Sequence, residues 1–178
     1  SGPTGGHLEL QTTGLLPNSY MVDLTVKPVA CRNFFSPSTK SMNIEWKQRA
    51  RQMEKGYNFE QRYTSLTYKP VDDSFDYLSE TKDEKETTSE SLDWVAFKNQ
   101  YFSCVFMAEQ NFDNATLESK MEQQGSGYMK NYAADMKTAF DPTGAKASHM
   151  QFYFGPNHFK TLLASNDLSF KDKDQELE

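Results

Sequence analysis

The sequence predicts an all-β protein, an antiparallel β-sandwich with a short helix near its C-terminal end. Short segments repeatedly alternate between apolar and polar side chains, which is the period of a strand with one buried face. Turn signals separate these segments about every ten residues, as in sandwiches. Aromatic residues make up 13% of the 178 residues, and aromatic side chains favour strands.

The N-terminal part of the chain is expected to contain a lead and one strand. Residues 1–14 open with Ser-Gly-Pro-Thr-Gly-Gly and are interpreted as a disordered lead or a cloning remnant. Residues 20–26 alternate cleanly and predict a half-buried strand. Its apolar face carries Tyr20, Val22, Leu24 and Val26. Residues 31–41 are rich in Asn, Ser and Pro and predict a loop.

Residues 43–51 also alternate, with Ile44, Trp46, Gln48 and Ala50 on one face and charged residues on the other. A strand is favoured, although the Lys, Arg, Gln and Glu content leaves a helix as the alternative. Residues 56–58 are interpreted as a turn. Residues 63–68 predict a strand that Lys69-Pro70 ends, and residues 75–79 predict a short one.

Residues 80–91 contain no apolar side chain, so they predict a solvated and mobile loop. A functional acidic patch is the alternative for this segment. The following stretch, residues 93–108, is the most apolar in the chain, and Tyr101–Ala108 is apolar or small on both alternating faces. This pattern predicts a central strand that is covered on both sides. Trp94, Tyr101 and Phe102 are therefore expected to be core aromatics.

The C-terminal part adds three strands and the helix. Residues 115–122 predict a strand, and the turn Gln-Gly-Ser-Gly at 124–127 follows. Residues 128–140 fit a long strand, with a helix as the alternative. Residues 148–154 predict the last strand, which Gly155-Pro156 is expected to end. Phe159, Leu162 and Leu163 then share one helical face.

These elements predict one sandwich domain over residues 15–170, followed by a linker at 171–178. The net charge of −6 argues against a nucleic-acid partner. The longest apolar run has five residues, 104–108, far short of the roughly 20 that a membrane-spanning helix needs. Cys31 and Cys104 are expected to be free thiols, with Cys104 buried, and a single disulfide is the alternative.

No arrangement of residues predicts catalysis. His7, His149 and His158 belong to no metal-binding motif, and no nucleophile elbow or phosphate-binding glycine loop occurs. The only nominee for an acid–base pair is His149 with Glu109. We therefore expect no catalytic residue, no cofactor-binding residue, no metal ligand and no enzyme activity.

A resemblance to a known family is carried by two groups of residues. Trp94-Val95-Ala96 is followed by Tyr101-Phe102, and Gly155-Pro156-Asn157 precedes the predicted helix. These residues resemble signatures of the periplasmic domain of the bacterial YidC membrane protein insertases. The resemblance covers roughly residues 15–170, corresponds to the larger C-terminal part of that domain, and points to a Bacteroides-like bacterium.

The resemblance implies a β-supersandwich similar to galactose mutarotase, held in the periplasm as part of an inner-membrane protein. It implies a non-catalytic role in the insertion and folding of membrane proteins, through contact with Sec translocase accessory subunits or with the nascent membrane proteins. A carbohydrate-binding or mutarotase-like module is the first alternative. A secreted sandwich that binds another protein is the second.

Overall fold

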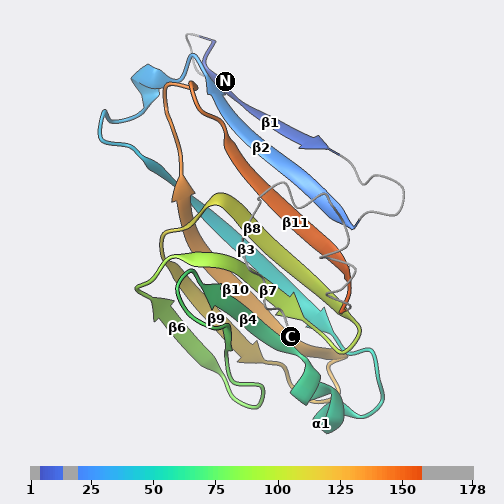
Figure 1. The fold of residues 1–178 in the computed structure, drawn as a ribbon. Coiled ribbons are helices and arrows are strands. Elements are labelled where there is room, and N and C mark those ends of the chain that lie inside the picture. The colour runs from blue at the N-terminus through green and yellow to red at the C-terminus, as the bar shows by residue number, and fades with distance from the viewer. Residues whose placement is uncertain (1–4, 14–19, 158–178) are drawn as a thin grey trace.

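The computed structural model describes residues 5–13 and 20–157, which form two antiparallel sheets (Figure 1). The large sheet has the strand order β1-β2-β11-β8-β7-β4-β5, and the small sheet has the order β3-β10-β9-β6. The predicted all-β sandwich is confirmed. The strands of the large sheet are β1 (His7–Thr13), β2 (Met21–Val29), β4 (Ser65–Pro70), β5 (Asp76–Tyr77), β7 (Leu92–Lys98), β8 (Phe102–Phe112) and β11 (Ser148–Pro156).

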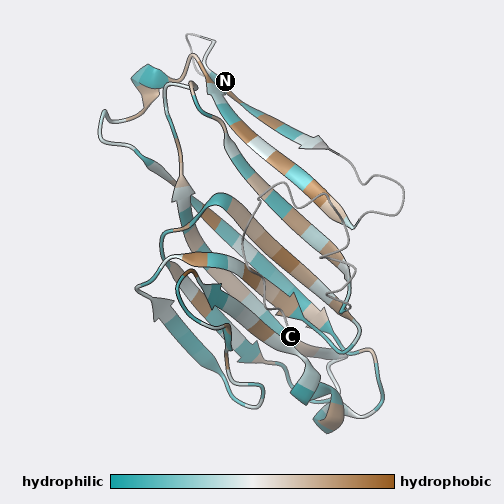
Figure 2. Cartoon of the chain, in the orientation of Figure 1, coloured by the Kyte–Doolittle hydropathy of each residue, from teal (hydrophilic) through white to brown (hydrophobic). Residues whose placement is uncertain are grey.

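The small sheet contains β3 (Ser41–Arg51), β6 (Glu84–Thr88), β9 (Ala115–Met121) and β10 (Tyr128–Ala139). The strand predictions for residues 43–51 and 128–140 are confirmed, because these segments pair with each other from Ser41↔Ala139 to Arg51↔Tyr128. The strands predicted at 20–26, 115–122 and 148–154 are confirmed as β2, β9 and β11. Figure 2 shows the alternation of apolar and polar residues along β2.

Two segments that were predicted to be irregular are strands at sheet edges. Within residues 80–91, β6 pairs with β9 from Glu84↔Ser119 to Thr88↔Ala115. Within residues 1–14, β1 pairs with β2 over its whole length. An edge strand is held by backbone hydrogen bonds to one neighbour and needs few buried side chains, so composition alone misses it.

Three smaller boundaries also differ from the predictions. The expected turn at 56–58 is the start of the short helix α1 (Tyr57–Glu60), which continues into a 3₁₀ turn at Gln61–Tyr63. Pro70 lies inside β4, where a bulge lets it pair with Leu92. Gly155 and Pro156 belong to β11 instead of ending it. The predicted helix around 159–163 and the linker at 171–178 lie outside the described residues.

The apolar stretch at residues 93–108 is a hairpin, not a single strand. β7 and β8 pair through Val95↔Phe106 and their neighbours. The Asn99 side-chain oxygen accepts hydrogen bonds from the backbone N–H groups of Tyr101 (2.9 Å) and Phe102 (2.7 Å), which closes the turn. Tyr101 and Phe102 therefore lie at the hairpin tip and are 44% and 50% exposed. Their prediction as core aromatics was wrong.

Both faces of this hairpin are buried, as predicted. Val95 and Phe106 belong to the main core, whereas Trp94 and Val105 belong to a second apolar cluster with Met21. Cys104 is half-buried, so the expectation that it is buried was wrong, and it is Cys31 that is buried. Both cysteines are free thiols, so the disulfide alternative does not apply. Among residues 5–13 and 20–157, no helix is long and apolar enough to cross a membrane.

The main core between the sheets is centred on Trp46 of β3. Its ring stacks on Phe97 with centroids 3.8 Å apart. It also meets Phe106 and Phe152 edge-on, at 5.8 Å and 5.5 Å. These contacts place β3 over the middle strands of the large sheet, β7, β8 and β11.

Candidate functional site

One side of the sandwich is open because the two sheets differ in width. Trp46 contacts Phe97 of β7, Phe106 of β8 and Phe152 of β11, so the edge strand β3 of the small sheet covers the large sheet as far as β11. The large sheet continues beyond β11 with β2 and β1. Figure 1 shows these two strands at one margin of the molecule, with β6 at the opposite margin. The inner face of β1 and β2 therefore extends past the small sheet.

This overhanging face is apolar and partly exposed. Val26 lies opposite Leu10 of β1, and Leu24 lies opposite Met150 of β11, so these side chains share the inner face. Leu10 is 64% exposed, while Leu24 and Val26 are half-buried. We call this surface, together with the free edge of β3, the open side. Its apolar members are Leu8, Leu10, Leu24, Val26 and Phe154.

Phe154 extends the open side along β11. It stacks on Phe152 with centroids 5.5 Å apart, and Phe152 in turn stacks on the buried Phe106 at 3.9 Å. The exposed fraction rises along this row, since Phe106 is 1% exposed and Phe154 is 46% exposed. The open side is thus a continuation of the core beyond the cover of the small sheet. Exposed apolar surface that adjoins a core is typical of an interaction surface.

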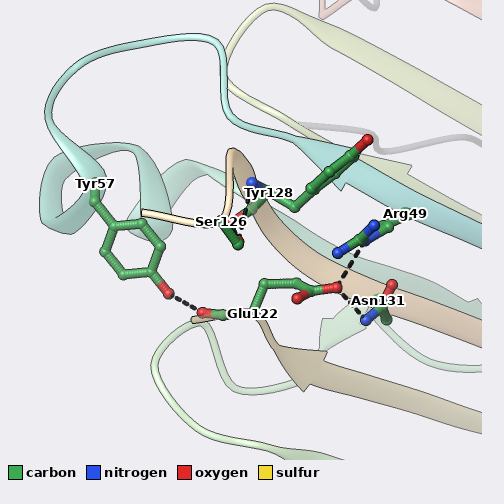
Figure 3. A network of polar contacts seen from close by, with 6 residues as sticks. All are labelled: Arg49, Tyr57, Glu122, Ser126, Tyr128 and Asn131. Atoms are coloured by element: carbon green, nitrogen blue, oxygen red, sulfur yellow. Dashed lines mark hydrogen bonds and ion pairs between the residues drawn. The ribbon is translucent and has the colours of Figure 1, made fainter. Parts of the chain in front are cut away.

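A polar network on the small sheet has a structural role (Figure 3). The Glu122 carboxylate accepts hydrogen bonds from Arg49 Nε (2.7 Å) and Asn131 Nδ2 (2.5 Å). The Arg49 guanidinium lies 3.6 Å from the centroid of the Tyr128 ring, and Tyr57 donates to the Glu122 carbonyl at 2.7 Å. The Arg49 hydrogen bond lowers the pKa of Glu122. These groups join β3, β10, β9 and α1, and their bonding capacity is largely used within the fold.

An acidic hollow of about 520 Å³ lies between β6 and the connection from β4 to β5. Asp73, Asp76, Glu86 and Glu90 line it, together with Tyr68. Burial, and next the nearby Glu86 carboxylate, raise the pKa of Tyr68. Within the residues that the structure describes, no three His, Cys, Asp or Glu side chains are grouped to hold a metal ion.

The nominated acid–base pair occupies neighbouring positions on β11 and β8, one register step beyond the facing residues Met150 and Ala108, on an exposed strand surface. His149 and Glu109 are both exposed, and their buried neighbours Ser148, Met150 and Ala108 show that they point to the outer face of the large sheet. The His149 ring nitrogen Nδ1 lies 3.1 Å from the Thr25 hydroxyl. Neither side chain lines the acidic hollow.

The signature residues lie in structural positions. Trp94, Val95 and Ala96 are buried in β7. A Cβ atom on Gly155 would come 2.6 Å from the Tyr153 hydroxyl oxygen, so this position accepts only glycine unless the ring moves. That hydroxyl donates to the Pro156 carbonyl at 2.8 Å. Tyr101, at the hairpin tip, donates to Glu54 at 2.5 Å and so links β8 to the segment before α1.

Sequence reasoning missed the open side. The alternation of Leu8 and Leu10 with Glu9 and Gln11 is a strand signal inside the segment that was interpreted as a lead. The overhang itself depends on the pairing of β2 with β11, which are more than a hundred residues apart in the chain. Local periodicity carries no information on such a pairing.

The fold and this surface define a class, an antiparallel β-sandwich domain whose most distinctive surface is apolar. The family model described as "YidC periplasmic domain" matches residues 6–175. The chain therefore belongs to the YidC periplasmic domain family, which places it in the periplasm. The match begins at residue 6, so it includes β1 and most of the predicted lead.

Several curated relatives are named "Membrane protein insertase YidC". The chain is 60% identical over 174 residues to the protein from Phocaeicola vulgatus, covering 98% of this chain and 28% of that protein. It is 53% identical to a Bacteroides fragilis protein, over 84% of this chain and 24% of that one. A Porphyromonas gingivalis protein is 36% identical, over 84% of this chain and 24% of that protein. The chain thus spans about a quarter of the length of the relatives it matches.

Proposed function

We propose that this chain is the non-catalytic periplasmic domain of an inner-membrane protein insertase, and that it assists insertion and folding by binding. Its partners are nascent membrane proteins or Sec translocase accessory subunits. The observation that carries this proposal is the open side, where Leu10 and Phe154 are about half exposed or more beside the main core. The family name supplies the context, since the relatives are named as insertases.

The physical argument starts from the cost of exposed apolar surface. About 25 cal/mol is lost for each Å² of apolar surface left in water. A domain that keeps Leu8, Leu10 and Phe154 exposed on one side gains free energy when a partner covers them. Membrane proteins in transit present apolar segments, and these are ligands that such a surface accepts.

Site-specific cross-linking in a full-length insertase that carries this domain tests the proposal. A photoreactive amino acid is placed at Phe154 or Leu10 on the open side, and at Lys120 or Lys137 on the outer face of the small sheet as controls. We expect adducts with a nascent membrane protein or with a Sec accessory subunit from the open side only. Equal adduct yields from both faces, or none from either, would contradict the proposal.

The carbohydrate-binding alternative gains no specific observation. A mutarotase-like site needs convergent acid and base groups in a cleft. The His149 ring lies within hydrogen-bonding distance of the Thr25 hydroxyl. The aromatic rings Phe152 and Phe154 stack on each other along β11. We therefore propose the binding role in insertion alone.

A further inference from the structure

We propose that the edge of β3 receives an extended polypeptide segment as an added strand, and that the open side buries the apolar side chains of that segment. This inference rests on the proposed function and names the place and the mode of contact. β3 has eleven residues and pairs with β10 alone among the residues that the structure describes. Its other edge therefore offers backbone groups to a further strand.

The direction of these backbone groups follows from the ends of β3. Just before β3, the Lys40 carbonyl accepts a hydrogen bond from Phe140 N at 2.9 Å. Just after β3, Gln52 N donates to the Gly127 carbonyl, also at 2.9 Å. Even-numbered residues thus direct their backbone groups toward the β10 side. Successive residues of a strand alternate, so the free edge presents the backbone groups of Asn43, Glu45, Lys47 and Arg49.

The same alternation sorts the side chains of β3. The even-numbered Ile44 and Trp46 face the core, and the odd-numbered Lys47 and Arg49 face solvent on the outer face of the small sheet. An added strand continues this arrangement, because neighbouring strands share the pleat. Every second side chain of the segment therefore points toward the large sheet.

The large sheet offers those side chains an apolar surface. Trp46 reaches Phe152 of β11 edge-on, so a strand added about 4.8 Å beyond β3 lies over the part of the large sheet at and beyond β11. That part contains the half-buried Leu24 on β2 and the exposed Phe154 at the end of β11. The segment would complete the small sheet and extend the core outward. Its inward positions are thus best filled by apolar residues.

The outward positions of the segment lie beside a mainly basic row. Lys47, Arg49 and Arg51 carry positive charges on the outer face of β3. Glu45 pairs with Lys47 and Glu122 pairs with Arg49, so the row keeps one unbalanced positive charge. Opposite charges in cross-strand pairs stabilise a sheet, and like charges destabilise it. The fitting ligand is therefore an extended amphipathic segment, apolar on one face and neutral or acidic on the other.

Fluorescence anisotropy with a labelled peptide tests this inference on the 178-residue chain. The probe is Val-Glu-Val-Thr-Val-Glu-Val-Thr-Val with an N-terminal fluorophore. Lys47→Pro removes an N–H group from the free edge but none from the ladder with β10. We expect this variant to bind at least about tenfold more weakly, through the lost bond and the clash of the ring. Lys47→Ala loses the same side chain but keeps the N–H group, and should bind within about twofold of the wild type.

A second pair of variants tests the apolar surface. Phe154→Ser removes a ring that is 46% exposed from the open side, and Phe59→Ser removes a ring that is 55% exposed from α1. We expect weaker binding, by about fivefold or more, only for the first variant. Hydrogen exchange provides a readout that does not need the proline variant, since bound peptide should slow exchange at Glu45 and Arg49 more than at Ile44 and Gln48.

Four outcomes would overturn the inference. They are the absence of peptide binding, equal binding by Lys47→Pro and Lys47→Ala, uniform exchange protection along β3, and a dimer of the chain that Lys47→Pro dissolves. The last result would make a second copy the occupant of the edge. If the peptide fails to bind while open-side cross-links form in the full-length insertase, this inference fails and the proposed function stands. If the peptide binds and no cross-link forms, the proposed function fails.

Discussion

Lys130 provides the sharpest test of the core energetics. This residue lies on β10 with its side chain fully buried, and its ammonium group donates to the Thr64 carbonyl. Burial lowers the pKa of Lys130 from 10.5 to about 8, and the nearby Glu80 only partly opposes the shift. At 1.36 kcal/mol per pKa unit, holding the charge in the folded state costs about 3 kcal/mol.

This cost varies with pH in a defined direction. Below about pH 8 both the folded and the unfolded states bind the proton, and the cost is constant. Between about pH 8 and 10.5 the folded state releases the proton while the unfolded state keeps it, so the stability rises with pH. From about pH 7 to about pH 9, the free energy of unfolding should rise by about 1 kcal/mol through Lys130.

Urea unfolding of the wild type and of Lys130→Met at these two pH values measures the effect. The variant should lack the rise, so the difference in free energy of unfolding between the two proteins should change by about 1 kcal/mol. Lys137→Met is the matched control, because Lys137 lies on the same strand and is exposed. The comparison remains valid if the Thr64 carbonyl, left without its donor, lowers the stability of the variant at both pH values. A pH-independent difference between wild type and Lys130→Met would refute this reasoning.

Three further variants test other parts of the fold. Glu60→Gln should lower the free energy of unfolding in urea by about 2 kcal/mol, because the buried carboxylate accepts two backbone hydrogen bonds and the amide can accept only one of them. The control Glu90→Gln, at an exposed position, should leave the stability unchanged. Equal effects of the two substitutions would contradict this role of Glu60. Trp46→Ala should cost about 3 kcal/mol or more by the same assay, through loss of the central aromatic contacts, and a cost below about 1 kcal/mol would exclude a central role. The Arg49 hydrogen bond lowers the pKa of Glu122, so the wild type should lose stability as the pH falls through that lowered pKa. Glu122→Gln should lose less stability over the same acid range. If the free energy of unfolding falls in parallel with pH in both proteins, the network does not contribute to stability.

The sequence predicted those strands that alternate and have one buried face. β2, β3 and β10 are such strands, and in each of them apolar residues on the buried face alternate with polar residues on the exposed face. β1 and β6 escaped prediction because an edge strand is held mainly by backbone bonds to one neighbour. The hairpin at 99–101 escaped because it lacks Gly and Pro, and the Asn99 side chain provides the hydrogen bonds that close the turn.

The open side was less accessible to prediction than the fold. It arises from the unequal widths of two sheets, and strand order across a sheet is set by contacts between distant parts of the chain. Leu8 and Phe154 are ordinary strand residues in the sequence, and only their position beyond the edge of β3 leaves them exposed. The family signature, in contrast, consists mostly of residues that support the fold, and so it identified the family without marking the surface.

The positions of the first and last described strands have a mechanical consequence. β1 and β11 flank β2 and both run antiparallel to it, so they run parallel to each other (Figure 1). A force that pulls the start of β1 and the end of β11 apart therefore acts along the strands. Antiparallel hydrogen bonds lie perpendicular to the strands, so such a force shears the bonds of β2 together instead of opening them one by one. A domain tethered through these two strands would therefore be mechanically strongest along the direction of the pulling force.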